Sequence, residues 1–198
     1  MTDAQIAPRQ PWILAIFLII AGAAGWWAAF NLTLDKFVVL EHPGADLNCN
    51  ISVLVQCGKN LASAQGSAFG FPNPLIGLGG FAAVIAVGVA LLAGAQFAKW
   101  FWIAFNVGIA GALAFVIWLI GTSIFVLGTL CPWCMLVWSA TIPLFWVVTL
   151  RNLREGVYGT AASPVGRALL PWVIPITIGS YLVVAVLAQV VLDVIHRL

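Results

Sequence analysis

Four cysteines carry the chemistry that this sequence offers, and they fall into two pairs. Cys131 and Cys134 enclose a Pro-Trp dipeptide, and Cys49 and Cys57 are separated by seven residues. Residues three apart in a helix are neighbours across one turn, so the CPWC pair can close a disulfide. The second thiol of such a pair can resolve a mixed disulfide formed by the first. The motif therefore predicts a redox-active dithiol, which needs both an electron donor and an electron acceptor.

The composition indicates an integral membrane protein. Of the 198 residues, 63% are hydrophobic and only 7% are charged, whereas a soluble domain carries about 25% charged residues. Only helices and closed barrels can span lipid, and continuous apolar runs select helices. The formal net charge of +2 gives no indication of a nucleic-acid partner. The elements that position the cysteines are therefore membrane-spanning helices.

Five apolar runs are long enough to cross a hydrocarbon core of about 30 Å. They cover residues 12–34, 74–95, 100–122, 125–150 and 169–192. The one long connection, 35–73, carries Cys49 and Cys57. Only one basic residue, Arg9, precedes the first run, which we interpret as a retained span and not as a cleaved signal. We predict an all-α membrane protein with a single domain over residues 1–198.

The placement of Lys and Arg predicts the orientation of the chain. With five spans, five basic residues fall on the side of the N-terminus and three on the side of the 35–73 loop. Cytoplasmic loops carry an excess of Lys and Arg, so we place the N-terminus in the cytoplasm and this loop outside. All four cysteines then lie at or near the outer face, where disulfides persist.

Two cysteine pairs on one face predict a relay by thiol–disulfide exchange. The CPWC pair is held by a helix, whereas we expect the loop pair to move between an outside partner and the membrane site. A dithiol inside a helix bundle needs an electron acceptor that also lives in lipid. A membrane quinone fits this requirement because it takes two electrons and two protons and diffuses in the bilayer. No residue spacing identifies its binding site.

Other interpretations of the cysteines stay open on the residues alone. Cys49 and Cys57 can form a purely structural disulfide, all four cysteines can hold zinc, and the CPWC pair can be inert, since free cysteines are often buried. A transporter or assembly subunit with a stapled loop is a further alternative. Transport is favoured by charges within the membrane, and no charged residue lies at the centre of any run. A carrier of electrons across the membrane would need a cysteine near the cytoplasmic face, and none is there.

The order of the polar and cysteine residues resembles the vitamin K epoxide reductase family over about residues 12–150. The resemblance is carried by Cys49, Cys57, Ser63, Phe69, Gly70, Asn73, Gly77, Cys131 and Cys134. It implies a four-helix bundle around a quinone site, to which bacterial members often add a fifth transmembrane helix. It also implies a place in the bacterial cytoplasmic membrane. A DsbB-like oxidase resembles the chain less, because its CxxC motif follows the first span.

The resemblance also implies roles and partners. Cys134 would be the active-site cysteine next to a quinone, menaquinone or ubiquinone, with Cys131 as its resolving partner. Cys57 would exchange with Cys131, and Cys49 with an external protein. Many bacterial members carry a fused thioredoxin-like domain. This chain ends at Leu198 without one, so we expect a separate DsbA-like partner with a thioredoxin fold in the periplasm.

Four further positions belong to the expected quinone site. Asn73 matches the family residue that donates to a quinone oxygen, and Ser63 and Phe69 match positions in the loop before the second span. Trp138 stands where the vertebrate enzymes have a Tyr, so a phenolic hydroxyl is missing there. Ser63 can also be a helix cap, and Asn73 followed by Pro74 is a good helix start in its own right.

Overall fold

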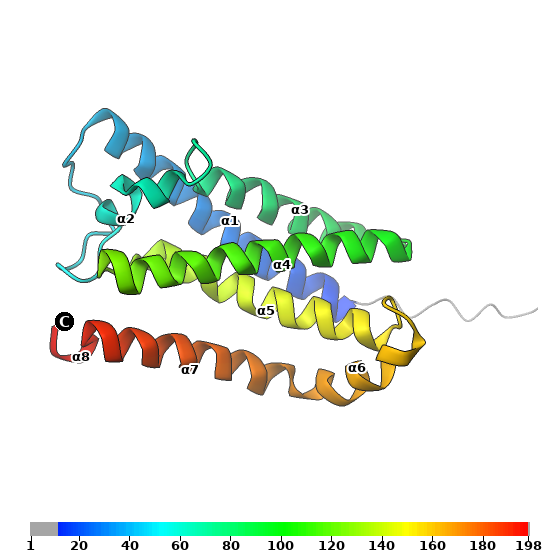
Figure 1. Cartoon of the computed structure of the whole chain (residues 1–198). Helices are drawn as coiled ribbons and strands as arrows, with labels where there is room; N and C mark the ends of the chain where they lie inside the picture. Colours follow the sequence, from blue (N-terminus) through cyan, green and yellow to red (C-terminus); the bar gives the residue numbers. More distant parts are fainter. Residues whose placement is uncertain (1–11, 198) are drawn as a thin grey trace, which may run out of the picture.

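A computed structural model describes residues 12–197, and the expected all-α membrane fold is confirmed (Figure 1). Arg9, which contributes to the predicted charge bias, lies outside the described residues. The five long helices are α1 (Trp12–Glu41), α3 (Pro74–Leu92), α4 (Lys99–Gly121), α5 (Pro132–Arg154) and α7 (Val173–Leu192). Each belongs to a helical segment that is long and apolar enough to cross a membrane, so the chain is a multi-pass membrane protein.

The helix boundaries differ most from the predicted spans at the end of α1 and around the connection between α4 and α5. α1 continues beyond residue 34 to Glu41. α4 continues through a π-helical segment, η2 (Thr122–Leu127), so residues 125–127 end the third span and do not begin the fourth. Gly128, with φ of +65°, terminates this segment in the left-handed region that favours glycine. The predicted start of the fourth span at 125 is wrong because the apolar run crosses this break without a change in hydropathy.

Four of the long helices form the bundle, and the fifth packs on its outside. α1 packs along α3 and α5, and α4 packs along α5. α7 lies beside α5 and leaves most of its apolar surface exposed (Figure 1). Small residues let α1 and α3 approach closely. A Cβ atom built on Gly25 would lie 2.3 Å from the Phe81 ring, so a larger residue there would push the two helices apart.

The loop after α1 covers one end of the bundle and contains two short helices, α2 (Gly58–Ala62) and η1 (Ala64–Ser67). Val55 and Leu130 form a parallel β-bridge, in which the Gln56 N–H donates to the Leu130 carbonyl at 2.9 Å. The Lys59 ammonium donates to the carbonyl of Leu127 at 2.7 Å. These bonds fasten the loop to the segment that leads into the CPWC motif.

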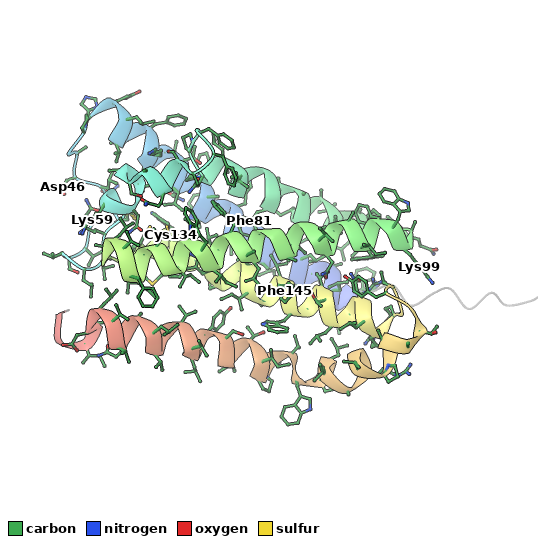
Figure 2. The ribbon with its side chains drawn as sticks, in the orientation of Figure 1. Asp46, Lys59, Phe81, Lys99, Cys134 and Phe145 are labelled. Atoms are coloured by element: carbon green, nitrogen blue, oxygen red, sulfur yellow. A yellow bond between two sulfur atoms is a disulfide. The ribbon has the colours of Figure 1, made fainter. Side chains whose placement is uncertain are left out.

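The opposite end of the bundle carries the connection from α5 to α7. This connection holds the short helices η3 (Thr160–Ala162), α6 (Ser163–Leu169) and η4 (Leu170–Trp172). A last helix, α8 (Val194–Arg197), follows α7. Figure 2 shows Lys99 at this opposite end and Lys59, Asp46 and Cys134 toward the end covered by the loop. The loop and the two cysteine pairs therefore share one end of the molecule.

Candidate functional site

The structure brings the two cysteine pairs into contact. Cys49 and Cys57 form a disulfide with their Cα atoms 5.7 Å apart, and Cys131 and Cys134 are free thiols. The Sγ atom of Cys131 lies 3.3 Å from the Sγ atom of Cys57. Cys57 and Cys131 are both completely buried. A separation of about 3–3.5 Å is that of atoms poised to react, so a sulfur of the loop pair can exchange with the CPWC pair without a large displacement.

Cys131 lies before the helix and not within it. It is the N-cap residue of α5 with an extended backbone, and Pro132 occupies the first helical turn, where its missing N–H costs nothing. The Cys131 sulfur accepts a hydrogen bond from the backbone N–H of Cys134 at 3.4 Å. Helix N-termini are common positions for reactive cysteines. The cap turns Cys131 toward the loop, whereas Cys134 lies inside the first turn.

The loop pair is held by apolar packing and by one asparagine. Leu32, Leu47 and Leu61 pack with the buried cysteines and keep water from them. The Asn50 side-chain oxygen accepts hydrogen bonds from the N–H groups of Cys57 at 3.1 Å and Gly58 at 3.2 Å. Sequence reasoning missed Asn50, although an Asn directly after a cysteine in a loop is a frequent turn former.

Two charged residues of α1 also reach this site, and sequence reasoning missed both. The carboxylate of Asp35 lies 3.4 Å from the Cys49 sulfur. Lys36 is buried, and its ammonium donates to the carbonyl of Leu61 at 2.5 Å. Ending the first span at residue 34 assigned both residues to the loop. The signal that could have found them is the apolar run Phe37–Leu40, which lets the helix continue past the charges.

A cavity of about 590 Å³ lies next to the CPWC motif, between α1, α3, α4, α5 and the α2–η1 segment. Its wall is largely apolar and includes Cys134 but not Cys131, and α7 contributes no residue to it. Pockets for small organic molecules span about 300–1,000 Å³. The two cysteines of the motif therefore have different neighbours: Cys131 contacts the loop pair, and Cys134 lines the cavity.

The cavity is open where α3 and α4 face each other. Gly80 on α3 and Gly108 and Gly111 on α4 line this part of the wall and are exposed. A Cβ atom built on any of the three would meet no other atom within 4 Å. Both helices are long and apolar enough to cross a membrane, so this side opening would face lipid.

A model of the vitamin K epoxide reductase family matches residues 16–149. The chain belongs to this family. No match was found among curated proteins or among solved structures. The matched region contains most of α1, all of α3 and α4, most of α5 and all four cysteines, whereas α7 follows it. Membership identifies the protein as a membrane thiol oxidoreductase, in a family that generally uses a quinone and works with thioredoxin-like partners.

The four positions that the family resemblance assigned to a quinone all line the cavity with Cys134. Asn73 stands at the N-cap position of α3 but makes no side-chain capping bond. Its amide donates to the carbonyl of Gln65 at 2.6 Å and accepts from the N–H of Ala68 at 2.9 Å, which holds the η1 turn in place. A second N–H of the amide remains for another acceptor.

Ser63 and Phe69 lie on the loop side of the cavity. The Ser63 hydroxyl caps η1 by accepting from the N–H of Gly66 at 3.1 Å, and it donates to the carbonyl of Asn60 at 2.7 Å. Its capping interpretation is therefore correct, and the residue also lines the cavity. Phe69 is 62% exposed and contacts Phe115 with ring centroids 5.5 Å apart, so it lies at the mouth.

Trp138 is almost completely buried and lines the cavity, one turn after Cys134. Its indole N–H makes no hydrogen bond with any group of residues 12–195. Every buried side-chain nitrogen and oxygen in this range has a hydrogen-bond partner. Since the indole N–H has none, it is not buried and reaches open space. The Trp in place of the vertebrate Tyr thus keeps a hydrogen-bond donor, since an indole N–H donates as a phenol does.

Proposed function

We propose that this protein oxidises a separate DsbA-like protein outside the cytoplasm and passes the two electrons to menaquinone or ubiquinone. The observation that carries the proposal is the unbroken series of contacts from loop to cavity. Cys49 is bonded to Cys57, Cys57 lies 3.3 Å from Cys131, and Cys134 lines the cavity. Such a series of contacts is what an electron relay requires. A purely structural disulfide between Cys49 and Cys57 would not need a second cysteine pair in contact with it.

The relay begins with the external partner. A thiolate of the partner attacks the Cys49 sulfur, and Cys57 leaves as a thiolate. The second thiolate of the partner then displaces Cys49, so the partner leaves with a disulfide and the loop pair is reduced. Cys49 suits this exchange because it lines a small groove at the surface with Asn48, Ile51 and Trp133, whereas Cys57 is fully buried.

The second half of the relay moves the electrons inward. The Cys57 thiolate attacks Cys131 of a Cys131–Cys134 disulfide, and Cys134 leaves as a thiolate. Cys49 then attacks Cys57, which restores the loop disulfide and leaves the CPWC pair reduced. The Cys49–Cys57 disulfide and the two free thiols of the motif support this order of exchanges. A bound quinone would accept two electrons from this pair as it closes to a disulfide, together with two protons from solvent that replace those the partner lost when its thiolates formed.

Several features of the cavity fit a quinone. Its wall is apolar, it opens sideways beside Gly108 and Gly111, and its volume of about 590 Å³ suits a ring with part of an isoprenoid tail. The free N–H groups of Trp138 and Asn73 would donate to the quinone oxygens, which are acceptors only. These donors orient the ring, and the apolar wall excludes water from Cys134.

We infer that the loop end faces the outside of the cytoplasmic membrane. The basic side chains of Lys99, Arg151, Arg154 and Arg167 come from the opposite end of the bundle, and the positive-inside rule assigns that end to the cytoplasm. In this orientation both cysteine pairs are near the compartment in which disulfides persist.

The test is a reconstituted assay with one Cys→Ala variant for each cysteine. The protein is incorporated into vesicles with menaquinone or ubiquinone and a reduced DsbA-like protein, and quinone reduction is followed by absorbance. Variants of Cys131 and Cys134 are expected to lose all quinone reduction. Incubated instead with the oxidised partner, whose disulfide the Cys49 thiolate can attack, the Cys57 variant is expected to trap a Cys49–partner disulfide, since no Cys57 thiol remains to resolve it. If all four variants still oxidise the partner, the relay is wrong.

A further inference from the structure

We propose that Asp35 is a catalytic acid–base residue of the loop pair, and this inference rests on the proposed function. Its carboxylate takes the proton of the Cys49 thiol when Cys49 attacks Cys57. It returns the proton when the partner displaces Cys49. The family resemblance assigned no role to this residue.

The contact between Asp35 and Cys49 is built into the fold. The extension of α1 past residue 34 brings the Asp35 side chain over the loop pair, where its Oδ2 atom lies 3.4 Å from the Cys49 sulfur. One carboxylate oxygen of Asp35 and both sulfurs of the pair lie within 4.8 Å of one another. Asp35 makes no ion pair and no other hydrogen bond with residues 12–195. A half-buried carboxylate without a partner gains nothing for stability, so its position calls for another explanation.

The redox state decides what this contact is. A disulfide sulfur has no proton to donate, and a carboxylate oxygen only accepts, so the oxidised pair gives Asp35 no hydrogen bond. Once the pair is reduced, Cys49 carries a thiol whose proton can point at Oδ2. The geometry therefore serves the reduced pair, which is the form that passes electrons inward.

Asp35 also assigns different tasks to the two loop thiols. Its negative charge lies closest to Cys49 and so holds the proton there, which leaves the thiolate on Cys57. Cys57 is the sulfur in contact with Cys131. The first attack therefore comes from the correct sulfur, and Cys49 remains a thiol until the second exchange.

The second exchange is balanced with Asp35 as the base. The Cys49 thiol gives its proton to Oδ2 while its sulfur attacks Cys57 in the Cys57–Cys131 mixed disulfide. A Cys49–Cys57 bond forms, the Cys57–Cys131 bond breaks, and Cys131 leaves with the electron pair. When the second thiolate of the partner later displaces Cys49, the same proton returns to the departing sulfur.

Among the side chains that the structure describes, those of residues 12–195, no other charged group forms a hydrogen bond or an ion pair with Asp35 or with the loop pair. Lys36 is the nearest in sequence, but its ammonium is bonded to the carbonyl of Leu61. Asp46, in the same loop as Cys49, is exposed and makes no such contact. Asp46→Asn therefore removes an equal charge nearby without touching the proposed proton transfer.

The experiment compares Asp35→Asn with Asp46→Asn in the reconstituted assay. Turnover is stopped with acid at set times, and the Cys57–Cys131 disulfide is quantified by mass spectrometry. General-base removal typically costs about 10²–10⁴-fold, and a thiol has its own thiolate fraction, so we expect turnover about 10- to 100-fold slower. The mixed disulfide should accumulate in Asp35→Asn and not in Asp46→Asn. Raising the pH should restore the rate, because solvent then deprotonates Cys49.

Two outcomes overturn the proposal. One is a normal rate in Asp35→Asn while the cysteine variants are inactive, which leaves the relay standing and removes Asp35 from it. The other is a slow variant that shows neither accumulated mixed disulfide nor recovery at high pH. If Asp35→Asn does not fold, Asp35→Glu, which keeps the carboxyl group, tests the proposal in its place. It should turn over within about tenfold of the wild type, and an inactive but folded Glu variant contradicts the proposal. If all four cysteine variants are active, the proposed function itself is wrong.

Discussion

The two ends of the helix bundle use their polar side chains differently. At the loop end, Asn60 joins the loop to the segment before the CPWC motif. Its amide donates to the Thr129 hydroxyl at 3.0 Å, and its side-chain oxygen accepts from the Ser123 hydroxyl at 2.9 Å. These bonds position Cys57 against Cys131, because α2 begins at the residue after Cys57 and carries Asn60.

At the opposite end, polar side chains join one long helix to another. The Thr149 hydroxyl of α5 donates to the Asn106 side chain of α4 at 3.1 Å. Asn152, completely buried, donates to the carbonyl of Trp102 at 3.1 Å. No cavity residue and no cysteine lies among these four. Polar groups at this end hold the bundle together, whereas those at the loop end hold reactive atoms in contact. Substitutions at the two ends should therefore separate stability from electron transfer.

The largest difference is expected from filling the side opening of the cavity. Gly111→Phe places a ring where a Cβ has no neighbour within 4 Å, so the protein should fold but exclude the quinone. We expect quinone reduction to fall more than tenfold, while exchange between the two cysteine pairs is unchanged. Stopped-flow absorbance and thiol labelling measure the two steps separately.

Gly179→Phe on α7 is the matched control, since this glycine also faces open space but does not line the cavity. It should keep the wild-type rate. A Gly111→Phe variant that reduces quinone as fast as this control would remove the cavity from the account.

Replacing one asparagine at each end of the helix bundle by alanine tests directly whether polar groups at the two ends have different roles. Asn60→Ala and Asn152→Ala each leave hydrogen-bond partners unsatisfied, which costs about 1–3 kcal/mol of stability. Only Asn60→Ala should also slow disulfide transfer, by several-fold, because the loop loses its bonds to Thr129 and Ser123. Thermal unfolding in detergent and single-turnover transfer rates provide the two readouts. Equal slowing in both variants would mean that the ends do not differ.

A smaller effect is expected from Trp138→Phe, which keeps an aromatic side chain but removes the indole N–H. Loss of one hydrogen bond of about 0.5–1.5 kcal/mol raises the KM for quinone about 2- to 10-fold. Disulfide transfer between the pairs should not change, since Trp138 lies on the cavity side of Cys134. Steady-state kinetics at several quinone concentrations check this. An unchanged KM would show that the indole N–H does not contact the quinone.

The smallest effect is expected at the fifth helix. The Tyr181 hydroxyl of α7 donates to the carbonyl of Ser139 on α5 at 2.6 Å, at an exposed position. Tyr181→Phe should cost less than about 1.5 kcal/mol of stability and leave quinone reduction unchanged. A melting curve and the turnover assay test both statements. No residue of α7 lines the cavity, so a clear loss of turnover would contradict this expectation and give α7 a role in electron transfer.

The sequence predicts those features that depend on composition and on the order of residues. Sparse charge required membrane helices, and the order of the cysteines with Ser63, Phe69 and Asn73 pointed to the family that the comparison confirmed. The break at Gly128 was missed because hydropathy does not respond to a single left-handed residue. Asn73 was expected to bind the quinone or to start a helix, but its amide makes no capping bond and instead holds the η1 turn, which only the folded loop reveals.

Contacts between distant segments could not be read from the sequence. Asn60 and Thr129 are 69 positions apart, and nothing in either neighbourhood marks them as partners. Asp35 lies next to Cys49 only because α1 continues past residue 34 and the loop folds back over it. We expected the loop pair to approach the membrane site by moving, whereas the structure has it already in contact.

The contact between Cys57 and Cys131 is the central claim, and a double variant tests it directly. Cys49→Ala combined with Cys134→Ala leaves only the two thiols whose sulfurs lie 3.3 Å apart. Mild oxidation followed by mass spectrometry of linked peptides should find one Cys57–Cys131 disulfide within nearly every chain. Free thiols, or disulfides only between separate chains, would contradict the account.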